Sequence, residues 1–159
     1  MAVDATITGP DFSEGVGLNE IPDEGMLAGR VGEEPVLLSR LDGQLFAVSG
    51  ACTHYGAQLA DGAIDRATVR CPLHHACFDL KTGAPLRAPA LDPLDRWLVE
   101  IEGDRAVVRR KLESPLQPQS RSSDDVRRIV IAGGGAAGLA CASELRRLGF
   151  EGEITILSA

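Results

Sequence analysis

The sequence predicts an all-β domain, a linker and a β-α-β unit, in that order. Up to about residue 111, short apolar runs of strand length alternate with turns that contain Gly and Asp, as in an antiparallel sandwich or barrel. Residues 112–126 are rich in Ser, Pro, Gln and charge and poor in apolar side chains, which is a linker composition. From residue 127 the pattern becomes strand, glycine turn, helix and second strand. The predicted boundaries are therefore 1–111, 112–126 and 127–159.

The first domain contains one strong hairpin signal and several shorter strand signals. Residues 36–40 and 45–48 flank Asp42-Gly43, a preferred sequence for a type I′ turn. Further strands are expected at residues 63–65, 68–70, 78–80, 97–102 and 105–109. Two loops that begin at Cys52 and Cys71 are expected at hairpin tips between these strands. By contrast, Pro89 and Pro93 lack N–H donors, so residues 86–93 are expected to form a rigid loop without regular ladder bonds.

The third segment begins with a glycine-rich turn after an apolar strand. Residues 129–132 form a continuous apolar run, as expected for a buried parallel strand. Gly133, Gly135 and Gly138 then give Gly-x-Gly-x-x-Gly, the dinucleotide-binding fingerprint in which a pyrophosphate sits at a helix N-terminus. A helix follows, and Gly149 is expected to end it. Its predicted apolar face comprises Ala137, Cys141, Leu145 and Leu148. The segment therefore predicts the start of an FAD-binding Rossmann domain.

The fingerprint also requires a carboxylate about 20 residues further on, to bind a ribose hydroxyl. No Asp or Glu follows Glu153, which opens the second strand. A single β-α-β unit also leaves its sheet largely uncovered. We therefore expect the Rossmann unit to be incomplete and the sequence to be the N-terminal portion of a longer protein.

Two short runs, ACTHYG at 51–56 and CPLHHACF at 71–78, contain a set of potential metal ligands. Cys52 and His54 form Cys-x-His, and after 16 intervening residues Cys71 and His74 form Cys-x-x-His. Each loop thus offers one thiolate and one imidazole. This pattern resembles the Rieske arrangement, in which two His replace two Cys on one iron of a 2Fe-2S cluster. One or two residues between ligands allow each loop to give its Cys to one iron and its His to the other.

A zinc site is the alternative use of two Cys and two His. Structural zinc sites favour Cys-x₂₋₄-Cys knuckles and His-x₃₋₅-His pairs, and neither occurs in this sequence. These spacings disfavour zinc. A Cys₂His₂ zinc-binding interaction domain nevertheless stays open as a function of a different class. Iron-sulfur colour in the purified protein would distinguish the two.

Composition and charge exclude several kinds of partner. The net charge of -7 argues against nucleic acid and is compatible with docking to a basic protein surface. No apolar run approaches the 18 residues needed to span a bilayer, and the start of the sequence lacks a secretory signal. Of the four cysteines, Cys77 and Cys141 lie in different modules, so a structural disulfide is not expected. These features predict a cytoplasmic protein without membrane contact.

Three stretches together resemble a known family. CTHYGAQLADG, CPLHHACFDLKTG and residues 127–159 are similar to apoptosis-inducing-factor-like ferredoxin reductases that carry an N-terminal Rieske domain. The resemblance implies Cys52, His54, Cys71 and His74 as cluster ligands, and the three glycines of the fingerprint as FAD-phosphate contacts. It implies an oxidoreductase in which NAD(P)H reduces FAD and electrons pass singly through the 2Fe-2S cluster. The implied partners are the protein's own flavoprotein domain and a redox protein, either ferredoxin-like or an oxygenase.

A stand-alone Rieske ferredoxin of an oxygenase or nitrite reductase system is the second redox interpretation, although such a carrier does not need the glycine fingerprint.

The second loop departs from the family pattern at several positions. Leu73 stands where an aromatic residue is common, and His75 stands where Gly is common. In high-potential relatives, Ser and Tyr hydroxyls donate to the cluster from the positions that Ala76 and Phe78 occupy here. The resemblance therefore implies a low-potential cluster. Of the remaining polar side chains, His75 is expected to be exposed, Cys77 to be a small core residue, and Tyr55 to pack over the cluster.

Overall fold

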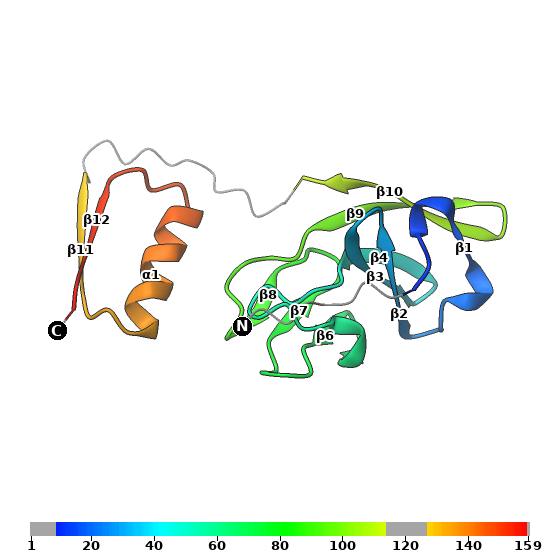
Figure 1. Ribbon diagram of the computed structural model, residues 1–159, viewed down its shortest axis with the longest axis horizontal. Helices are drawn as coiled ribbons and strands as arrows, with labels where there is room; N and C mark the ends of the chain where they lie inside the picture. Colours follow the sequence, from blue (N-terminus) through cyan, green and yellow to red (C-terminus); the bar gives the residue numbers. More distant parts are fainter. Residues whose placement is uncertain (1–8, 114–126, 159) are drawn as a thin grey trace. The chain divides into compact units, whose positions relative to one another are not determined.

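The computed structural model describes residues 9–113 and 127–158 (Figure 1). Contacts between segments divide the chain into two units, Met1–Pro115 and Leu116–Ala159. The predicted linker at 112–126 lies outside the described residues except for Leu112 and Glu113. Leu112 is the last residue of strand β10 (Arg105–Leu112), so the final strand runs one residue past the predicted boundary.

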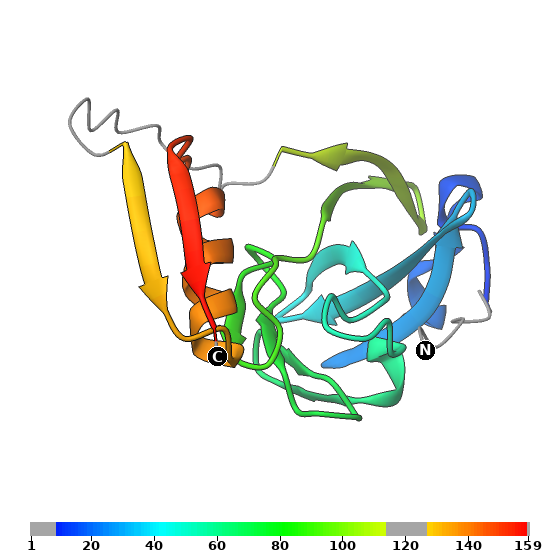
Figure 2. The same ribbon diagram turned by 60° about the vertical axis from the view of Figure 1, so that its left-hand side comes forward.

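The first unit contains two antiparallel sheets and three short 3₁₀ turns. The six-stranded sheet has the order β1-β10-β9-β4-β3-β2. Its other strands are β1 (Val16–Gly17), β2 (Gly25–Val31), β3 (Glu34–Leu41), β4 (Gln44–Ser49) and β9 (Arg96–Glu102). The four-stranded sheet comprises, in order, β5 (Ala63–Asp65), β6 (Thr68–Arg70), β7 (Cys77–Asp79) and β8 (Pro85–Arg87). The 3₁₀ turns are η1 (Phe12–Glu14), η2 (Leu18–Glu20) and η3 (Leu59–Asp61). In Figure 2 the short green strands of the smaller sheet lie beside the longer blue and cyan strands.

The β3–β4 hairpin confirms the strongest local prediction. Asp42 and Gly43 have φ of 49° and 73°, so both central turn residues are left-handed, as a type I′ turn requires. The pairing continues without a break from Leu41 opposite Gln44 to Val36 opposite Ser49. Because successive side chains alternate between faces, this register decides which residues of β3 and β4 enter each core.

Two hydrophobic cores lie on opposite faces of the central strands. The core that includes the ligand loops, called here the loop core, consists of Leu37, Leu41, Val48, Cys52, Ala57, Leu59, Val69, Cys71, Ala76, Phe78, Leu80, Ala90 and Leu94. The second core, called the sheet core, consists of Phe12, Val16, Ile21, Val36, Leu38, Ala47, Trp97, Ala106 and Val108. Strand β3 supplies alternate residues to both cores and is therefore apolar along most of its length. The loop core packs strands of the two sheets together around the predicted metal ligands.

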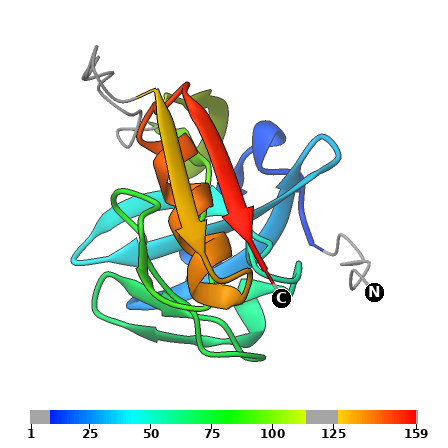
Figure 3. The ribbon, with the colours of Figure 1, turned by 90° about the vertical axis from the view of Figure 1, so that its left-hand side faces the viewer.

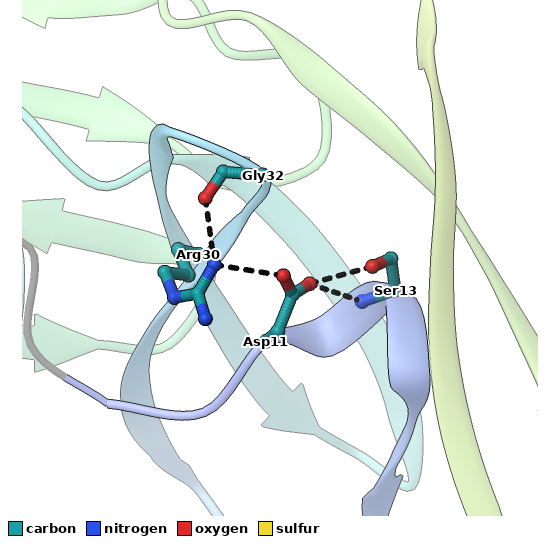
Figure 4. A network of polar contacts seen from close by, with 4 residues as sticks. All are labelled: Asp11, Ser13, Arg30 and Gly32. Carbon is teal, nitrogen blue, oxygen red and sulfur yellow. Dashed lines mark hydrogen bonds and ion pairs between the residues drawn. The ribbon is translucent and has the colours of Figure 1, made fainter.

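A polar network attaches the start of the described chain to β2 (Figure 4). The Arg30 guanidinium Nη1 donates to Asp11 Oδ2 at 2.9 Å and to the Gly32 carbonyl at 2.9 Å. The Ser13 hydroxyl and backbone N–H both donate to Asp11 Oδ1, at 2.6 and 3.0 Å. These bonds from Ser13, together with the charge of Arg30, hold the pKa of the Asp11 carboxyl below its ordinary value. The network places Phe12 in the sheet core.

The loop expected at 86–93 is partly a strand, so that prediction was wrong for its first residues. Strand β8 includes Leu86 and Arg87, and Arg87 pairs with Cys77 of β7. A proline is tolerated at the first residue of an edge strand, where its missing N–H disrupts no ladder, and Pro85 takes that place. From Ala88 to Pro93 the chain forms no strand, as predicted.

The second unit is a β-α-β unit, in agreement with the predicted order of elements. Strands β11 (Arg128–Ala132) and β12 (Glu153–Leu157) pair in parallel, and helix α1 (Ala136–Arg147) connects them. Figure 3 shows α1 against one face of this pair. Gly149 has φ of 83° and its N–H donates to the Arg146 carbonyl, which confirms the predicted helix stop. No helix within residues 9–113 and 127–158 has the length and apolar character to cross a membrane.

The predicted apolar face of α1 is wrong in its orientation. Ala137, Cys141 and Leu148 are exposed, and only Leu145 of the expected set is partly buried. A Cβ at Gly138 would lie 1.9 Å from the Gly133 carbonyl oxygen, so the helix approaches the strand turn most closely at this glycine. That contact fixes the rotation of the helix about its axis, and Ala142 and Leu145 lie on the same face one and two turns later.

Candidate metal centre

The two predicted ligand loops leave different sheets and meet in the loop core. The second loop lies between β6 and β7, which pair up to Arg70 opposite Cys77, so it is a hairpin tip as predicted. The first loop follows β4 and is closed by a single bridge between Ala51 and Gln58. The prediction of a hairpin tip was therefore wrong for the first loop, because β4 pairs with β3 and β9 instead of with the strand that comes next.

The backbones of the two loops close in the same way. The Cys52 N–H donates to the Ala57 carbonyl at 2.8 Å, and the Cys71 N–H donates to the Ala76 carbonyl at 2.8 Å. Both hydrogen bonds join a cysteine to the fifth residue after it. The fourth residue after each cysteine is left-handed, with φ of 73° at Gly56 and 60° at His75. The two loops thus share the same backbone hydrogen bond and the same left-handed position. They differ in that the His stands two residues after the Cys in the first loop and three residues after it in the second.

The thiols lie inside these loops and the imidazoles lie toward solvent. Cys52 and Cys71 are 3% and 2% exposed, whereas His54 is partly exposed and His74 is exposed. The two imidazole rings are near one another, with centroids 5.0 Å apart. Tyr55 lies beside both, with its ring centroid 4.3 Å from that of His54 and 5.7 Å from that of His74. The structure therefore brings the two thiols together and, separately, the two imidazoles.

The sulfur of Cys52 is in a polar environment despite its burial. Burial raises the pKa of the Cys52 thiol above its ordinary value, and the adjacent Cys71 thiol raises it further. The backbone N–H groups of His54 and Tyr55 act in the opposite direction by donating to the sulfur. Because metal binding requires the thiolate, a bound cation would supply the charge needed to remove the proton.

Two adjacent thiols and two neighbouring imidazoles are a donor set that fits a 2Fe-2S cluster. Nowhere in residues 9–113 and 127–158 do three or more His, Cys, Asp or Glu side chains gather as ligands of one ion. A tetrahedral zinc site would need four ligands around one point. In a Rieske cluster each iron takes only two protein ligands, two Cys on one iron and two His on the other. The buried pair of thiols and the adjacent pair of imidazoles match that division.

A proline-containing loop contacts the first ligand loop. The Thr53 hydroxyl donates to the Asp92 carbonyl at 2.8 Å, and Ala90 is buried in the loop core with Cys52 and Cys71. The Ala88–Pro89 peptide bond is cis. Thr53 was not among the residues that the sequence singled out. The one sequence feature that could have pointed to Thr53 is its hydroxyl, which stands directly after the ligand Cys52 and can donate to another segment.

Two further predicted residues lie at the site. His75 is exposed, as expected. Cys77 was expected in the core but is only partly buried. Its thiol donates to the His75 carbonyl at 3.5 Å and so supports the loop.

The left-handed conformation of His75 leads to a stability prediction. A residue with a Cβ in this region costs about 1–2 kcal/mol, and β-branched residues tolerate it least. We expect His75→Gly to leave the free energy of unfolding unchanged or raise it by about 0.5 kcal/mol, since relief of strain is offset by greater freedom of the unfolded chain. His75→Val should lower it by about 1–2 kcal/mol. Urea denaturation of both variants is the measurement, and a destabilising His75→Gly would show that the imidazole itself stabilises the loop.

The three glycines Gly133, Gly135 and Gly138 lie at the turn from β11 into α1. Gly133 has φ of 112°, a conformation that side chains rarely adopt. Gly135 is the N-cap residue of α1, and the tight contact at Gly138 lets the helix approach the strand turn.

Comparison with known proteins places the first unit in a family. Residues 16–102 match the family model described as the Rieske [2Fe-2S] domain. Human apoptosis-inducing factor 3 is 38% identical over 133 residues, which cover 76% of this chain and 22% of that protein. The ferredoxin component of the naphthalene 1,2-dioxygenase system of Pseudomonas aeruginosa is 34% identical over 95 residues, covering 60% of this chain and 91% of that protein. The chain therefore spans about a fifth of the length of the first relative and nearly all of the second.

A solved structure gives the same result for the fold. The ferredoxin in a complex of reduced oxygenase and oxidized ferredoxin in carbazole 1,9a-dioxygenase has a TM-score of 0.57 and 30% identity, covering 61% of this chain and 93% of that chain. The family match spans more than half of the sequence, and a Rieske domain implies a 2Fe-2S cluster. The chain belongs to the Rieske [2Fe-2S] domain family.

Proposed function

We propose that Cys52, His54, Cys71 and His74 bind the 2Fe-2S cluster and that the first unit transfers single electrons through it. The observation that carries this assignment is the pairing of the two loops. Equivalent Cys-to-Ala hydrogen bonds close both loops, the Cys52 and Cys71 thiols are adjacent, and the His54 and His74 ring centroids lie 5.0 Å apart. When bound, the cluster supplies one-electron redox chemistry at this point.

The chain's own residues divide the surroundings of the cluster into two sides. Cys52 and Cys71, at 3% and 2% exposed, hold the cysteine side in the loop core and keep water from it. His54 and His74 leave the opposite side near the surface, where an electron can pass to or from another protein. Tyr55 and Leu73, 52% and 50% exposed, are large apolar side chains beside these two histidines. Exposed aromatic and aliphatic groups at a functional edge are typical of a docking surface.

We propose a redox protein as the partner at this edge. In the carbazole 1,9a-dioxygenase complex, a ferredoxin with 30% identity to this chain is bound to an oxygenase. A partner of that kind, or a flavoprotein domain of the same polypeptide, would exchange electrons through His54 and His74.

We further propose that the whole protein is an FAD-dependent NAD(P)H oxidoreductase of the ferredoxin reductase type. The support is the β-α-β unit, in which Gly133, Gly135 and Gly138 would receive the FAD pyrophosphate. The 133-residue similarity to apoptosis-inducing factor 3 also extends beyond the residues that match the Rieske model. A stand-alone ferredoxin is the alternative, supported by the 91% coverage of the naphthalene dioxygenase ferredoxin component.

Metal and sulfide content, followed by reductive titration, tests the electron-transfer function. Protein produced with ample iron should contain two irons and two acid-labile sulfides per chain, and its visible absorption should bleach reversibly with one electron. Stoichiometric zinc without sulfide would instead support the Cys₂His₂ zinc interaction domain. Stable FAD binding by the whole protein, lost on Gly138→Leu without loss of iron, would test the flavoprotein proposal independently.

The redox potential of the cluster is expected to be low. Rieske potentials span about -150 to +300 mV and rise with hydrogen bonds to the sulfurs. Ala76 and Phe78 are both fully buried in the loop core, and neither side chain has a donor, so the hydroxyl donors of high-potential relatives are absent at these positions. The backbone donors of His54 and Tyr55 to Cys52 remain. We expect a midpoint potential below 0 mV in protein-film voltammetry at neutral pH.

Two substitutions would introduce the hydroxyl donors that Ala76 and Phe78 lack. Ala76→Ser should raise the midpoint by tens of millivolts, and addition of Phe78→Tyr should raise it further, because each hydroxyl stabilises the reduced cluster. Ala76→Gly is the matched control, since it changes the side chain without adding a donor. A wild-type midpoint well above 0 mV would contradict the expectation.

A further inference from the structure

The exposed large apolar side chains of the first unit gather around the two ligand loops. Among the residues that the structure describes, these side chains are Tyr55, Leu73, Leu86, Leu91 and Ile101. Tyr55 and Leu73 belong to the ligand loops, and Leu86 and Leu91 belong to the segment 85–93. Only Ile101 lies elsewhere, on β9. Apolar groups that are grouped on a surface are typical of an interaction site, whereas single scattered ones are ordinary.

The segment 85–93 connects the surroundings of the two ligand loops. Near its start, Arg87 pairs with Cys77, directly after the second loop. Near its end, the carbonyl of Asp92 accepts from the Thr53 hydroxyl of the first loop at 2.8 Å. The segment and the two loops therefore form one continuous part of the surface. We call this part the docking edge and define it as residues 51–58, 70–77 and 85–93.

The charge of the docking edge is opposite in sign to that of the whole chain. The chain has 16 Lys and Arg against 23 Asp and Glu, a net charge of -7. The docking edge has two arginines, Arg70 and Arg87, and one carboxylate, Asp92. All three side chains are exposed. A protein that approaches the ligand loops therefore meets a local excess of positive charge.

Arg70 and Arg87 lie on the same face of the four-stranded sheet. Both residues pair with Cys77, Arg70 from β6 and Arg87 from β8. Residues directly opposite one another in antiparallel strands project to the same face, so the two arginines flank Cys77 beside the second ligand loop. Their Cα atoms are separated by two strand spacings, roughly 10 Å. Two guanidinium groups at this separation can contact carboxylates on one partner surface.

The guanidinium groups of Arg70 and Arg87 are free to meet a partner. Within residues 9–113 and 127–158, neither forms an ion pair or a hydrogen bond. Asp61 lines the same surface opening as Arg70 but does not pair with it. Four other basic side chains of the first unit do pair with carboxylates: Arg30, Arg40, Arg109 and Lys111. The positive charge at the docking edge is therefore not neutralised by the protein's own carboxylates.

We infer that the docking edge receives a separate redox protein whose own docking face carries carboxylates. The carboxylates would lie against Arg70 and Arg87, and apolar side chains of the partner would lie against Tyr55 and Leu73. Charge attraction mainly accelerates the encounter of two diffusing proteins. A domain on the same polypeptide is already held nearby by its linker and gains less from it. The inference rests on the proposed electron-transfer function and adds the chemistry of the partner.

Stopped-flow electron exchange with two cytochromes tests the inference. Cytochrome b5 presents carboxylates around its haem edge, and cytochrome c presents lysines there. Each is mixed with the cluster-loaded protein, in the direction of electron flow that the two midpoint potentials allow. The second-order rate constant with cytochrome b5 should fall about fivefold or more between roughly 20 and 200 mM ionic strength, because salt screens the attraction.

Substitutions assign the attraction to the docking edge. Arg70→Gln and Arg87→Gln should each lower the low-salt rate constant with cytochrome b5 about threefold, and salt should remove the difference. Neither variant should lower the rate constant with cytochrome c, since loss of a positive charge does not weaken attraction for a basic protein. Arg110→Gln is the matched control. Arg110 is an exposed arginine of β10, in the other sheet, and is also unpaired within the described residues, so its loss should leave both rate constants unchanged.

Reversible one-electron reduction of the cluster, measured in each variant, keeps this inference apart from the proposed function. If the cluster is reduced normally but Arg70→Gln and Arg87→Gln react with cytochrome b5 as fast as Arg110→Gln does, the inference is overturned and the electron-transfer function stands. A cluster that cannot be reduced would remove both. A dimer in size-exclusion chromatography that Arg70→Gln abolishes would assign the docking edge to a second copy of the chain and would also overturn the inference.

Discussion

Replacement of Cys71 by Ser is expected to abolish incorporation of the 2Fe-2S cluster, and Cys52→Ser should do the same. Each thiolate supplies one of the two protein-sulfur bonds to the cluster, and a Ser hydroxyl at neutral pH is a much weaker ligand than a thiolate. Both sulfurs lie in the loop core, so no other cysteine can replace them without movement of the backbone. Iron and acid-labile sulfide should fall from two each per chain to background, with loss of the visible absorption.

Two cysteines serve as matched controls for this result. Cys77→Ser and Cys141→Ser should retain iron and sulfide at the wild-type level, because Cys77 bonds only to a loop carbonyl and Cys141 is exposed on α1. Full occupancy in Cys52→Ser or Cys71→Ser would remove the ligand assignment. Loss in the Cys77 variant alone would extend the ligand set to a residue outside it.

Gly62→Ala should produce a large loss of stability in the first unit. A Cβ at Gly62 would lie 2.0 Å from the Arg70 carbonyl oxygen and 3.1 Å from the Leu59 carbonyl oxygen. Both obstacles are backbone atoms, so the clash can be relieved only by moving β6 or η3. We expect a cost of about 3 kcal/mol, the upper end of the range for overpacking. For a domain of roughly 100 residues this corresponds to a fall in melting temperature of about 12–24 °C.

The effect should extend to the metal centre, because Arg70 directly precedes Cys71 and Gly62 packs against its carbonyl. Calorimetric unfolding of the iron-sulfur protein measures the loss. Gly43→Ala is the control: it has open space around its Cβ but φ of 73°, so it should cost only the conformational penalty of about 1 kcal/mol. Equal stability of the two variants would show that the chain absorbs the Gly62 clash.

Elements with a strong local signal could be predicted from the sequence. Asp42-Gly43 specifies its own turn and hence the register of β3 on β4, and β5 and β6 have the bounds that were expected. The Cys-x-His and Cys-x-x-His spacings pointed to two loops whose thiols are adjacent and whose imidazole rings are neighbours in the structure. In each case the information lies within a few adjacent residues, in turn chemistry or in ligand type.

Elements that depend on distant contacts could not be predicted in this way. Strand β2 contains two glycines and no clear alternation, and its seven pairs with β3 form because that partner strand is already in place. Strand β8 begins at a proline and was expected to be loop. The face that α1 presents is fixed by the backbone contact at Gly138, which hydrophobic spacing does not reveal.

The ladders beside the second ligand loop are shorter than the ladder that joins β2 to β3. Strands β5, β6 and β7 form ladders of three pairs each, whereas β2 and β3 share seven. Sub-global opening follows the weakest ladders, so amide hydrogens of the four-stranded sheet should exchange with solvent before those of β3. The second ligand loop should then open early. Strand β3, which contributes to both cores, should open last. Cys52 follows a strand that pairs with β3, and Cys71 follows a strand of the four-stranded sheet, so the two cysteines lie in segments that should open at different rates. A group bound by both cysteines would make the two segments open together.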